Sequence, residues 1–322
     1  MKIFIISNHW LYLLFILFYS GSIFPNELTQ PKGAVVTSNA LATKAGEKIL
    51  AEGGNAYDAA TTISAMLSVV EPFASGLGGG AFWLIYDAKS KKYTMLDARE
   101  TAPLQSHKNM YLDENANVIK NMSTLGPLSA GIPGVPAVLS YVNDKYGSKK
   151  LSTLLDPAYE AAINGFPVNE RYLKGAKYKK KWLKKYKETE AIFLHNGEVP
   201  KKGWILKQTD LARTIKKLMK DGHRSFYTGG FAKRMVESVQ NNGGIWSEGD
   251  LNRYKVLERE PVRSTYKGIS IIAPGLPSSG GLVLSNALNI LAGYDLDKLT
   301  RTTQKHLIIE SLRRAYYERA FK

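Results

Sequence analysis

Residues 75–86, Ser-Gly-Leu-Gly-Gly-Gly-Ala-Phe-Trp-Leu-Ile-Tyr, form the stretch that decides the fold: a glycine-rich turn followed by six apolar or aromatic residues. A short run without polar alternation is typical of a strand in a sheet that is covered on both faces. Residues 87–92 then predict a polar turn, and residues 93–99, Tyr-Thr-Met-Leu-Asp-Ala-Arg, predict a returning strand. We therefore expect a hairpin that brings Arg99 to the end of a strand.

Two helices are predicted upstream of this hairpin. The first covers about residues 42–52 and stops at Gly53-Gly54, where φ can become positive; its inner stripe is Ala42, Ala45, Ile49 and Leu50. Asn55 is a suitable N-cap for the second helix, whose many small residues imply close packing. Pro72 is expected to end it.

The chain downstream of the hairpin is predicted to be mainly helical between residues 129 and 220. A further helix is expected at residues 229–240, and another opens after the small-residue turn at 277–281. Residues 266–273 are expected to form one strand, and residues 303–322 a final helix.

The composition is that of a globular protein. Hydrophobic residues make up 44% and charged residues 22% of 322 residues, which allows one large domain or two ordinary ones with a sizeable core. The balance of 44 basic and 28 acidic residues gives a net charge of +16, which favours anionic partners in general. The absence of cysteine excludes a thiolate nucleophile, disulfides, cysteine-based zinc sites and attachment as a lipoprotein.

Much of the excess charge lies in residues 171–187, where lysines alternate with Tyr172, Tyr178, Trp182 and Tyr186. This alternation superficially resembles a nucleic-acid site that combines phosphate contacts with base stacking. We favour a solvated helix instead, because no recognised nucleic-acid module surrounds the stretch; its inward residues are expected to be Leu173, Trp182 and Leu183. No nucleic-acid partner is therefore expected.

The first residues have the pattern of a secretory signal. Lys2 precedes an apolar run at residues 11–19, and small residues follow at 20–22. The run is shorter than the roughly 18–20 apolar residues that span a bilayer. We expect a signal peptide over 1–22, a linker over 23–32 and a periplasmic or secreted protein. An uncleaved anchor, lengthened by His9 and Trp10, is the alternative.

The glycines at 76–80 match the sequence pattern of a dinucleotide-binding fingerprint but not its structural context. That fingerprint needs a strand before it and a helix after it, so that the phosphate meets the N-terminus of the helix. Here the predicted order is helix, glycines and strand. We expect a tight turn beside closely packed backbone rather than a nucleotide site.

No nucleophile stands out in the sequence. A Gly-x-Ser-x-Gly elbow is missing, and no two of the five histidines have metal-ligand spacing: His9, His107, His195, His223 and His306. Ser278-Ser279 lies in a glycine-rich turn without a neighbouring histidine or lysine, although a base distant in sequence stays open. No metal and no other cofactor is expected.

Arg99 is the candidate binding residue. A guanidinium at the end of an apolar hairpin should be partly desolvated and then needs an anion, and it grips a carboxylate with two bonds where lysine cannot. From residue type alone, a structural ion pair with Asp97, Glu100 or another acid is favoured over ligand binding.

Several motifs, in order, resemble the large subunit of γ-glutamyltransferases (glutathione hydrolases). The first are Ala42-Thr-Lys-Ala-Gly46, Ile49-Leu-Ala-Glu-Gly-Gly-Asn-Ala-Tyr-Asp-Ala-Ala60, Val69-Val-Glu-Pro72 and Ser75-Gly-Leu-Gly-Gly-Gly-Ala-Phe82. The later ones are Asp97-Ala-Arg-Glu-Thr-Ala-Pro103, Gly131-Ile-Pro-Gly-Val-Pro136 and Leu276-Pro-Ser-Ser-Gly-Gly281. The resemblance runs from about Gly33 to the last residue.

The resemblance implies an α+β fold of the N-terminal-nucleophile hydrolase type, in which two sheets lie between helical layers (αββα), here its large-subunit part. Such enzymes are made as a precursor, a zymogen that cuts itself. The new N-terminal threonine of the small subunit attacks a γ-glutamyl amide such as glutathione, and its own α-amine can serve as base. The acyl group then passes to water, an amino acid or a peptide. Arg99 matches the family's arginine for the glutamate α-carboxylate.

The resemblance also implies that the reactive half is elsewhere. No threonine here matches the nucleophile's context, so no catalytic residue is assigned, and the threonine is expected beyond Lys322. Residues 33–322 are then a large-subunit region that is incomplete at its C-terminus: a fragment, a truncated frame or half of a split gene. The alternatives are a non-catalytic remnant or binding protein of the same fold, a related amide acylase, and a basic protein that binds envelope polymers or nucleic acid.

Overall fold

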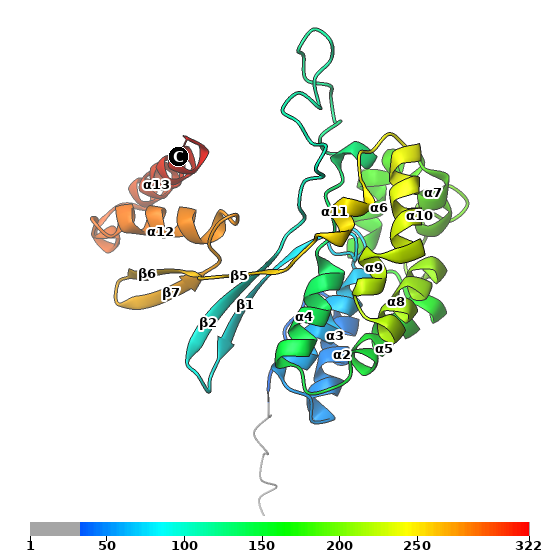
Figure 1. The fold of residues 1–322 in the computed structure, drawn as a ribbon. Coiled ribbons are helices and arrows are strands. Elements are labelled where there is room, and N and C mark those ends of the chain that lie inside the picture. Colours follow the sequence, from blue (N-terminus) through cyan, green and yellow to red (C-terminus); the bar gives the residue numbers. More distant parts are fainter. Residues whose placement is uncertain (1–32, 322) are drawn as a thin grey trace, which may run out of the picture.

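The protein, seen here as a computed structural model, is described over residues 33–321 and is a mixed α+β structure. Figure 1 shows a large helical body, an antiparallel sheet beside it, and a smaller unit of two helices and a hairpin beyond the sheet. The signal and linker expected at 1–22 and 23–32 lie outside the described residues. Within residues 33–321, no helix is both long and apolar enough to cross a membrane.

Two antiparallel neighbours, α2 (Ala40–Ala51) and α3 (Ala56–Val70), begin the helical body. Asn39 caps α2 by accepting a hydrogen bond from the Leu41 amide. Asn55 caps α3 as predicted, and Asp58 returns the bond by accepting from the Asn55 amide at 2.9 Å. Both predicted helices are confirmed, and the second ends just before Pro72.

Asp58 does more than close this cap. Its side chain is fully buried and also accepts bonds from the Ser148 hydroxyl and from the amides of Ser148 and Lys149. Burial raises the pKa of Asp58, but the bonds from Ser148, Asn55 and Lys149 outweigh it and hold the pKa below the ordinary value. The carboxylate therefore ties the start of α3 to the turn between the next two helices.

The rest of the body is helical, as residues 129–220 and 229–240 predicted. Its helices are η1 (Pro127–Ser129), α4 (Val135–Tyr146), α5 (Leu151–Asn164), α6 (Glu170–Leu183), α7 (Lys187–Phe193), α8 (Thr209–Asp221), α9 (Arg224–Tyr227), α10 (Gly229–Asn241) and α11 (Glu248–Asn252). Two very short strands, β3 (Phe166–Pro167) and β4 (Ile205–Leu206), pair between them. One apolar core runs through this body and contains Val69, Ile132, Leu139, Leu155, Leu206, Ile215 and Leu251.

The predicted hairpin is present. Strands β1 (Ala81–Asp87) and β2 (Lys92–Ala98) pair antiparallel, with Ala81 opposite Ala98, and β5 (Leu257–Arg259) adds to β2. Helix α4 covers one face of the sheet through a buried cluster of Ile85, Leu96, Ala98, Val138 and Val142.

The expectation that this sheet is covered on both faces is only partly met in the described residues. Side chains alternate along β1, so Ile85 is buried under α4 whereas Leu84 is 41% and Tyr86 50% exposed. Figure 1 shows no helical layer of residues 33–321 over the second face of the hairpin. The second face is therefore covered only in part: Met95 on β2 is fully buried there, whereas Leu84 and Tyr86 on β1 are exposed.

A second expectation is wrong: residues 266–273 do not form one strand. They belong to a hairpin of β6 (Val262–Tyr266) and β7 (Ile269–Ala273). Lys267 and Gly268 turn it with φ values of 46° and 80°, the left-handed conformation that two-residue hairpin loops require. The hairpin is followed by α12 (Gly280–Leu291), η2 (Leu296–Lys298) and α13 (Arg301–Phe321), as the small-residue turn and the last helical pattern predicted.

The Asp58 network predicts an acid-dependent stability. Because its folded pKa is depressed, its contribution is present above the unfolded pKa of about 3.9 and is lost as the pH falls through the folded value. Asp58→Asn should lower the free energy of unfolding by about 1.5–3 kcal/mol at pH 7. The gap to the parent should close at about pH 2, as measured by urea titration. Asp156→Asn, at an exposed position on α5, should change little. A gap that is the same at both pH values would contradict this role.

Candidate functional site

Three segments distant in sequence meet where β2 ends. The Gly79 carbonyl accepts hydrogen bonds from the amides of Gly134 and Val135, at 2.8 and 3.1 Å. Thr101 and Ile132 exchange backbone bonds of 2.8 and 3.3 Å. The glycine turn at 75–80, the strand end at 97–103 and the loop at 131–136 are therefore one structural unit, with Arg99 in the middle segment.

Backbone packs directly against backbone at the end of β2, which explains why glycine occupies positions 80 and 134. A Cβ on Gly80 would lie 2.7 Å from the Ala98 carbonyl oxygen, and one on Gly134 would overlap that oxygen and the Tyr254 hydroxyl. The glycines follow α3 and precede β1, so the strand–glycines–helix order of a dinucleotide-binding fingerprint is not present here. The prediction of a tight turn beside close-packed backbone is confirmed.

Asp97, the acid nearest Arg99 in sequence, is already occupied. It is buried, and its Oδ2 lies 2.7 Å from Nε of Arg259 on β5, while its Oδ1 accepts from the Arg99 amide at 3.1 Å. From residue type alone, Arg99 was expected to form a structural ion pair with Asp97, Glu100 or another acid, and this expectation is wrong for the described residues. In the part of the chain that the structure describes, the Arg99 side chain forms no ion pair with any acid. It is also exposed rather than partly desolvated.

The Tyr254 side chain fixes the backbone of Arg99. Its hydroxyl donates to the Arg99 carbonyl at 2.9 Å, and its ring stacks on Tyr227 with centroids 5.5 Å apart. Burial, followed by the carboxylates of Asp97 and Glu100, raises the pKa of Tyr254 above its ordinary value. The phenol therefore stays neutral near pH 7 and keeps its proton for this bond.

Tyr227 continues this support. Its hydroxyl donates to the Pro133 carbonyl at 2.8 Å and accepts from the Ala137 amide at 3.2 Å, which fastens the 131–136 loop. Burial raises its pKa well above the ordinary value. Sequence reasoning missed Tyr227, Tyr254 and Arg259, because each reaches the site across more than 90 residues and no local pattern marks it.

Ser278-Ser279 lies beside the same sheet but lacks an activating partner. The Gly275 amide contacts Sδ of Met95, which brings the turn before α12 against β2. The Ser278 hydroxyl accepts from the Gly280 amide at 3.2 Å. Within residues 33–321, neither serine is hydrogen-bonded to a histidine or lysine side chain.

The described histidines do not form a site. His195 lies against the Trp204 ring, and burial lowers the pKa of the half-buried His223. His107 and His306 are exposed, and His9 lies outside the described residues. Among residues 33–321, no three histidine, aspartate or glutamate side chains gather as metal ligands would.

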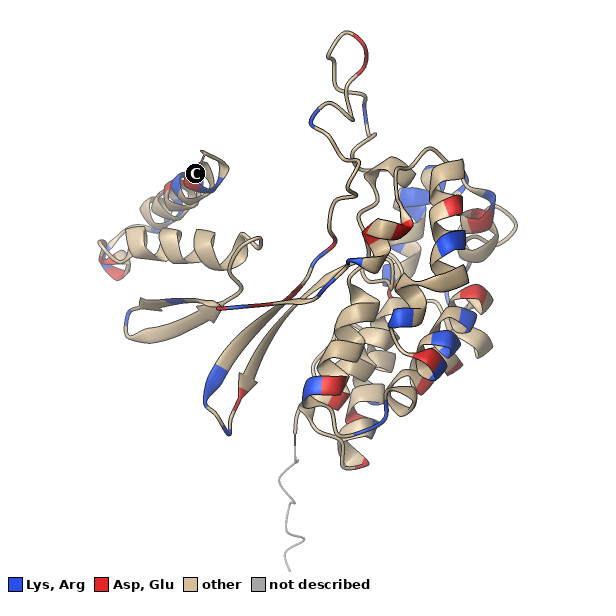
Figure 2. Ribbon diagram, in the orientation of Figure 1, with Lys and Arg blue, Asp and Glu red and all other residues tan. Residues whose placement is uncertain are grey.

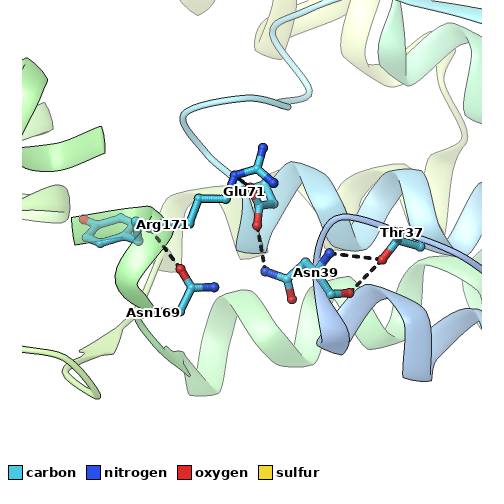
Figure 3. Close-up of polar contacts among 6 residues, drawn as sticks. Thr37, Asn39, Glu71, Asn169 and Arg171 are labelled. Atoms are coloured by element: carbon cyan, nitrogen blue, oxygen red, sulfur yellow. Dashed lines mark hydrogen bonds and ion pairs between the residues drawn. The ribbon is translucent and has the colours of Figure 1, made fainter. Parts of the chain in front are cut away.

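A buried polar cluster anchors the start of the basic stretch (Figure 3). The Glu71 side chain is 1% exposed; its Oε1 accepts from Nδ2 of Asn39 at 2.9 Å, and its Oε2 lies 3.3 Å from Nε of Arg171. Asn169 caps α6 by accepting from the Tyr172 amide. The stretch is therefore a helix fixed to the body. Of its predicted inward residues, Leu173 and Leu183 pack on the main core and Trp182 is half-buried.

Comparison with known proteins agrees with this architecture. Residues 42–321 match the family model described as gamma-glutamyltranspeptidase. The glutathione hydrolase proenzyme of Pseudomonas sp. (strain A14) is 39% identical over 290 residues, which cover 89% of this chain and 50% of that protein. The glutathione hydrolase proenzyme of Escherichia coli (strain K12) is 38% identical over 268 residues, covering 83% and 46%.

The crystal structure of Helicobacter pylori gamma-glutamyltranspeptidase superposes with a TM-score of 0.86 at 38% identity, covering 89% of this chain and 83% of that one. The fold is thus the α+β fold of N-terminal-nucleophile hydrolases, as the resemblance implied. The chain belongs to the gamma-glutamyltranspeptidase family. It spans about half the length of the curated relatives it matches.

The glycine packing predicts which small substitution is harmful. Gly134→Ala should destabilise the protein by about 1–3 kcal/mol, because the new methyl group has to displace the Ala98 carbonyl or the Tyr254 ring. Gly78→Ala is the matched control, since nothing lies within 4 Å of a Cβ at that position. Urea midpoints of the two variants measure the difference. Equal stability would mean that the loop is not tightly packed on β2.

Proposed function

We propose that this chain is the large-subunit part of an enzyme that hydrolyses or transfers the γ-glutamyl group of glutathione and related amides, and that Arg99 binds the glutamate α-carboxylate. One observation carries the role of Arg99. Its exposed guanidinium stands at the end of β2 without an ion-pair partner in residues 33–321, although buried Asp97 lies two residues away. The relatives named as glutathione hydrolases support the substrate class.

Arg259 explains how Arg99 stays available. By pairing with Asp97 it removes the acid that would otherwise hold the Arg99 side chain. The backbone of Arg99 is meanwhile held at its amide by Asp97 and at its carbonyl by Tyr254. Only the side chain has to be ordered on binding, and a guanidinium fork can then take both oxygens of an incoming carboxylate.

We place the nucleophile outside the present chain, as the N-terminal threonine of a small subunit that follows Lys322 in the same precursor or comes from a neighbouring reading frame. Its free α-amine would accept the proton of its own hydroxyl, which then attacks the γ-glutamyl carbonyl. The amide nitrogen leaves with a proton, and water, an amino acid or a peptide takes the acyl group. The unactivated Ser278 and Ser279 support this assignment.

Uncovered apolar surface supports a missing partner. The open face of the hairpin exposes Leu84 and Tyr86. On α13, six apolar or aromatic side chains are exposed: Ile308, Ile309, Leu312, Tyr316, Tyr317 and Phe321. Contiguous apolar surface of this kind marks interaction sites. We propose that the small subunit packs on these surfaces.

We also propose that the protein is exported, with residues 1–22 as its signal and residues 23–32 as a linker. The charged start, the short apolar run and the small residues that follow it support this proposal.

The first experiment compares residues 1–322 alone with the same chain expressed together with the segment encoded after Lys322. Cleavage of a γ-glutamyl anilide and of glutathione is measured. Only the completed protein should be active, because the chain alone lacks the proposed nucleophile. Activity of residues 1–322 alone would show that the nucleophile is here. Inactivity of both would favour a non-catalytic remnant, and equal cleavage of amides without an α-carboxylate would favour another acylase.

The second experiment tests Arg99 in the completed protein. Arg99→Ala should raise KM for γ-glutamyl donors about ten- to hundredfold, which corresponds to about 1.5–3 kcal/mol for lost charge-assisted bonds, while self-cleavage persists. Arg99→Lys should recover part of the loss, because charge returns without the fork. Arg234→Ala, at an exposed arginine of α10, serves as the control. Unchanged turnover by Arg99→Ala would exclude the carboxylate role.

A further inference from the structure

The γ-glutamyl site leaves the basic helix α6 without a role, and its residues divide sharply between two faces. Tyr172 and Ala176 are buried against the body. Lys174, Lys177 and Lys181 follow one another at helical spacing on the opposite side, and all three are exposed. Tyr178 projects from the same side and is 82% exposed. We call these four residues the lysine face.

The lysine face is not neutralised by the protein. In residues 33–321, Lys180 and Lys184 pair with Glu198 and Glu190, but Lys174, Lys177 and Lys181 have no ion-pair partner. No acidic residue occurs from 171 to 187, whereas α8 and α10 carry charges of both signs (Figure 2). Like charges three and four residues apart repel each other, so an anionic partner would relieve this repulsion.

The helix presents these charges in a fixed arrangement. The ion pair of Arg171 with buried Glu71 and the cap from Asn169 hold its first turn against the body (Figure 3). The Tyr172 hydroxyl donates to the Phe193 carbonyl at 2.6 Å and links α6 to α7. The lysine face is therefore a preformed, outward-facing surface on a helix that is fixed to the body.

The shape of this surface favours a flat partner over a nucleic-acid strand. Base stacking needs several projecting aromatic rings, but Tyr172 is buried and Trp182 and Tyr186 are half-buried, which leaves Tyr178 alone. A convex row of lysines can lie on a layer of phosphate groups, while a single tyrosine places its ring at the headgroup level. We propose that the lysine face of α6 docks the protein on a membrane surface rich in anionic phospholipid.

Vesicle co-sedimentation of the full chain tests this proposal. Vesicles of phosphatidylcholine alone are compared with vesicles that contain about 30% phosphatidylglycerol, at low and high salt (about 0.05 and 0.5 M). The parent should bind the anionic vesicles at low salt, release them at high salt and bind the neutral ones much less. The triple variant K174Q/K177Q/K181Q should lose about tenfold or more in partitioning.

The matched control is K44Q/K120Q/K220Q, which removes the same charge from exposed lysines elsewhere. Its partitioning onto anionic vesicles should stay within about twofold of the parent's, because net charge alone does not hold the protein on the membrane surface. Residues 1–32 are present in all three proteins, so any binding through them is common to all. Circular dichroism verifies folding, and should the triple variant not fold, each single variant must still show a partial loss.

Other outcomes would overturn the proposal. Equal loss in the two triple variants would assign binding to net charge rather than to α6. Salt-independent binding, or equal binding to neutral vesicles, would assign it to an apolar segment. If an oligonucleotide binds through the same three lysines while anionic vesicles do not bind, the lysine face is a nucleic-acid site.

Discussion

The site depends on one constraint: backbone must approach backbone at the end of β2. The Ala98 carbonyl lies where a side chain on Gly80 or Gly134 would have to be, and the Gly79 carbonyl takes two amides of the neighbouring loop. Glycine is the only residue that permits this approach without displacement. Three segments are locked together as a result, and the position of Arg99 follows from their packing rather than from its own contacts.

Electrostatic pairing then decides what Arg99 can do. A buried carboxylate needs a partner, and Asp97 has two candidates, Arg99 and Arg259. Arg259 arrives on β5, opposite β2, and takes that place. As a result, the Arg99 guanidinium has no ion-pair partner in the described residues. Tyr254 holds the Arg99 carbonyl, and Tyr227 holds the Pro133 carbonyl of the neighbouring loop. The proposed carboxylate clamp depends on contacts between distant parts of the chain, 155 residues apart for Arg99 and Tyr254 and 162 apart for Asp97 and Arg259.

The local elements and the β1–β2 hairpin could be predicted from the sequence, but the contacts between segments distant in the chain could not. The 3.6-residue patterns gave α2, α3, α8 and α10, and the Asn55 cap and the β1–β2 hairpin followed from turn chemistry. The Lys267–Gly268 turn was missed because the strand before it, Val-Arg-Ser-Thr-Tyr at 262–266, is largely polar and lacks the apolar pattern of residues 269–273. Arg99 itself was found through family motifs. Its freedom from Asp97 was not, since the competing Arg259 is visible only in three dimensions.

The exposed face of β1 is a second feature that the sequence could not predict. An apolar run reports that a strand is suited to burial, but not whether its cover belongs to the same segment of chain. Here α4 covers one face, and Leu84 and Tyr86 stay exposed on the other. The chain spans about half of its relatives' length. This exposed surface and the unpaired arginine both support the proposal that a small subunit completes the site.

The central claim is that Arg99 contacts the donor's α-carboxylate, and a cycle that changes both partners tests it most directly. In the completed protein, kcat/KM is measured for a γ-glutamyl anilide and for its α-carboxamide analogue, with Arg99 and with Arg99→Ala. The account predicts that loss of the donor carboxylate lowers kcat/KM about ten- to hundredfold with Arg99 present and hardly at all in Arg99→Ala. Equal losses in both proteins would contradict it.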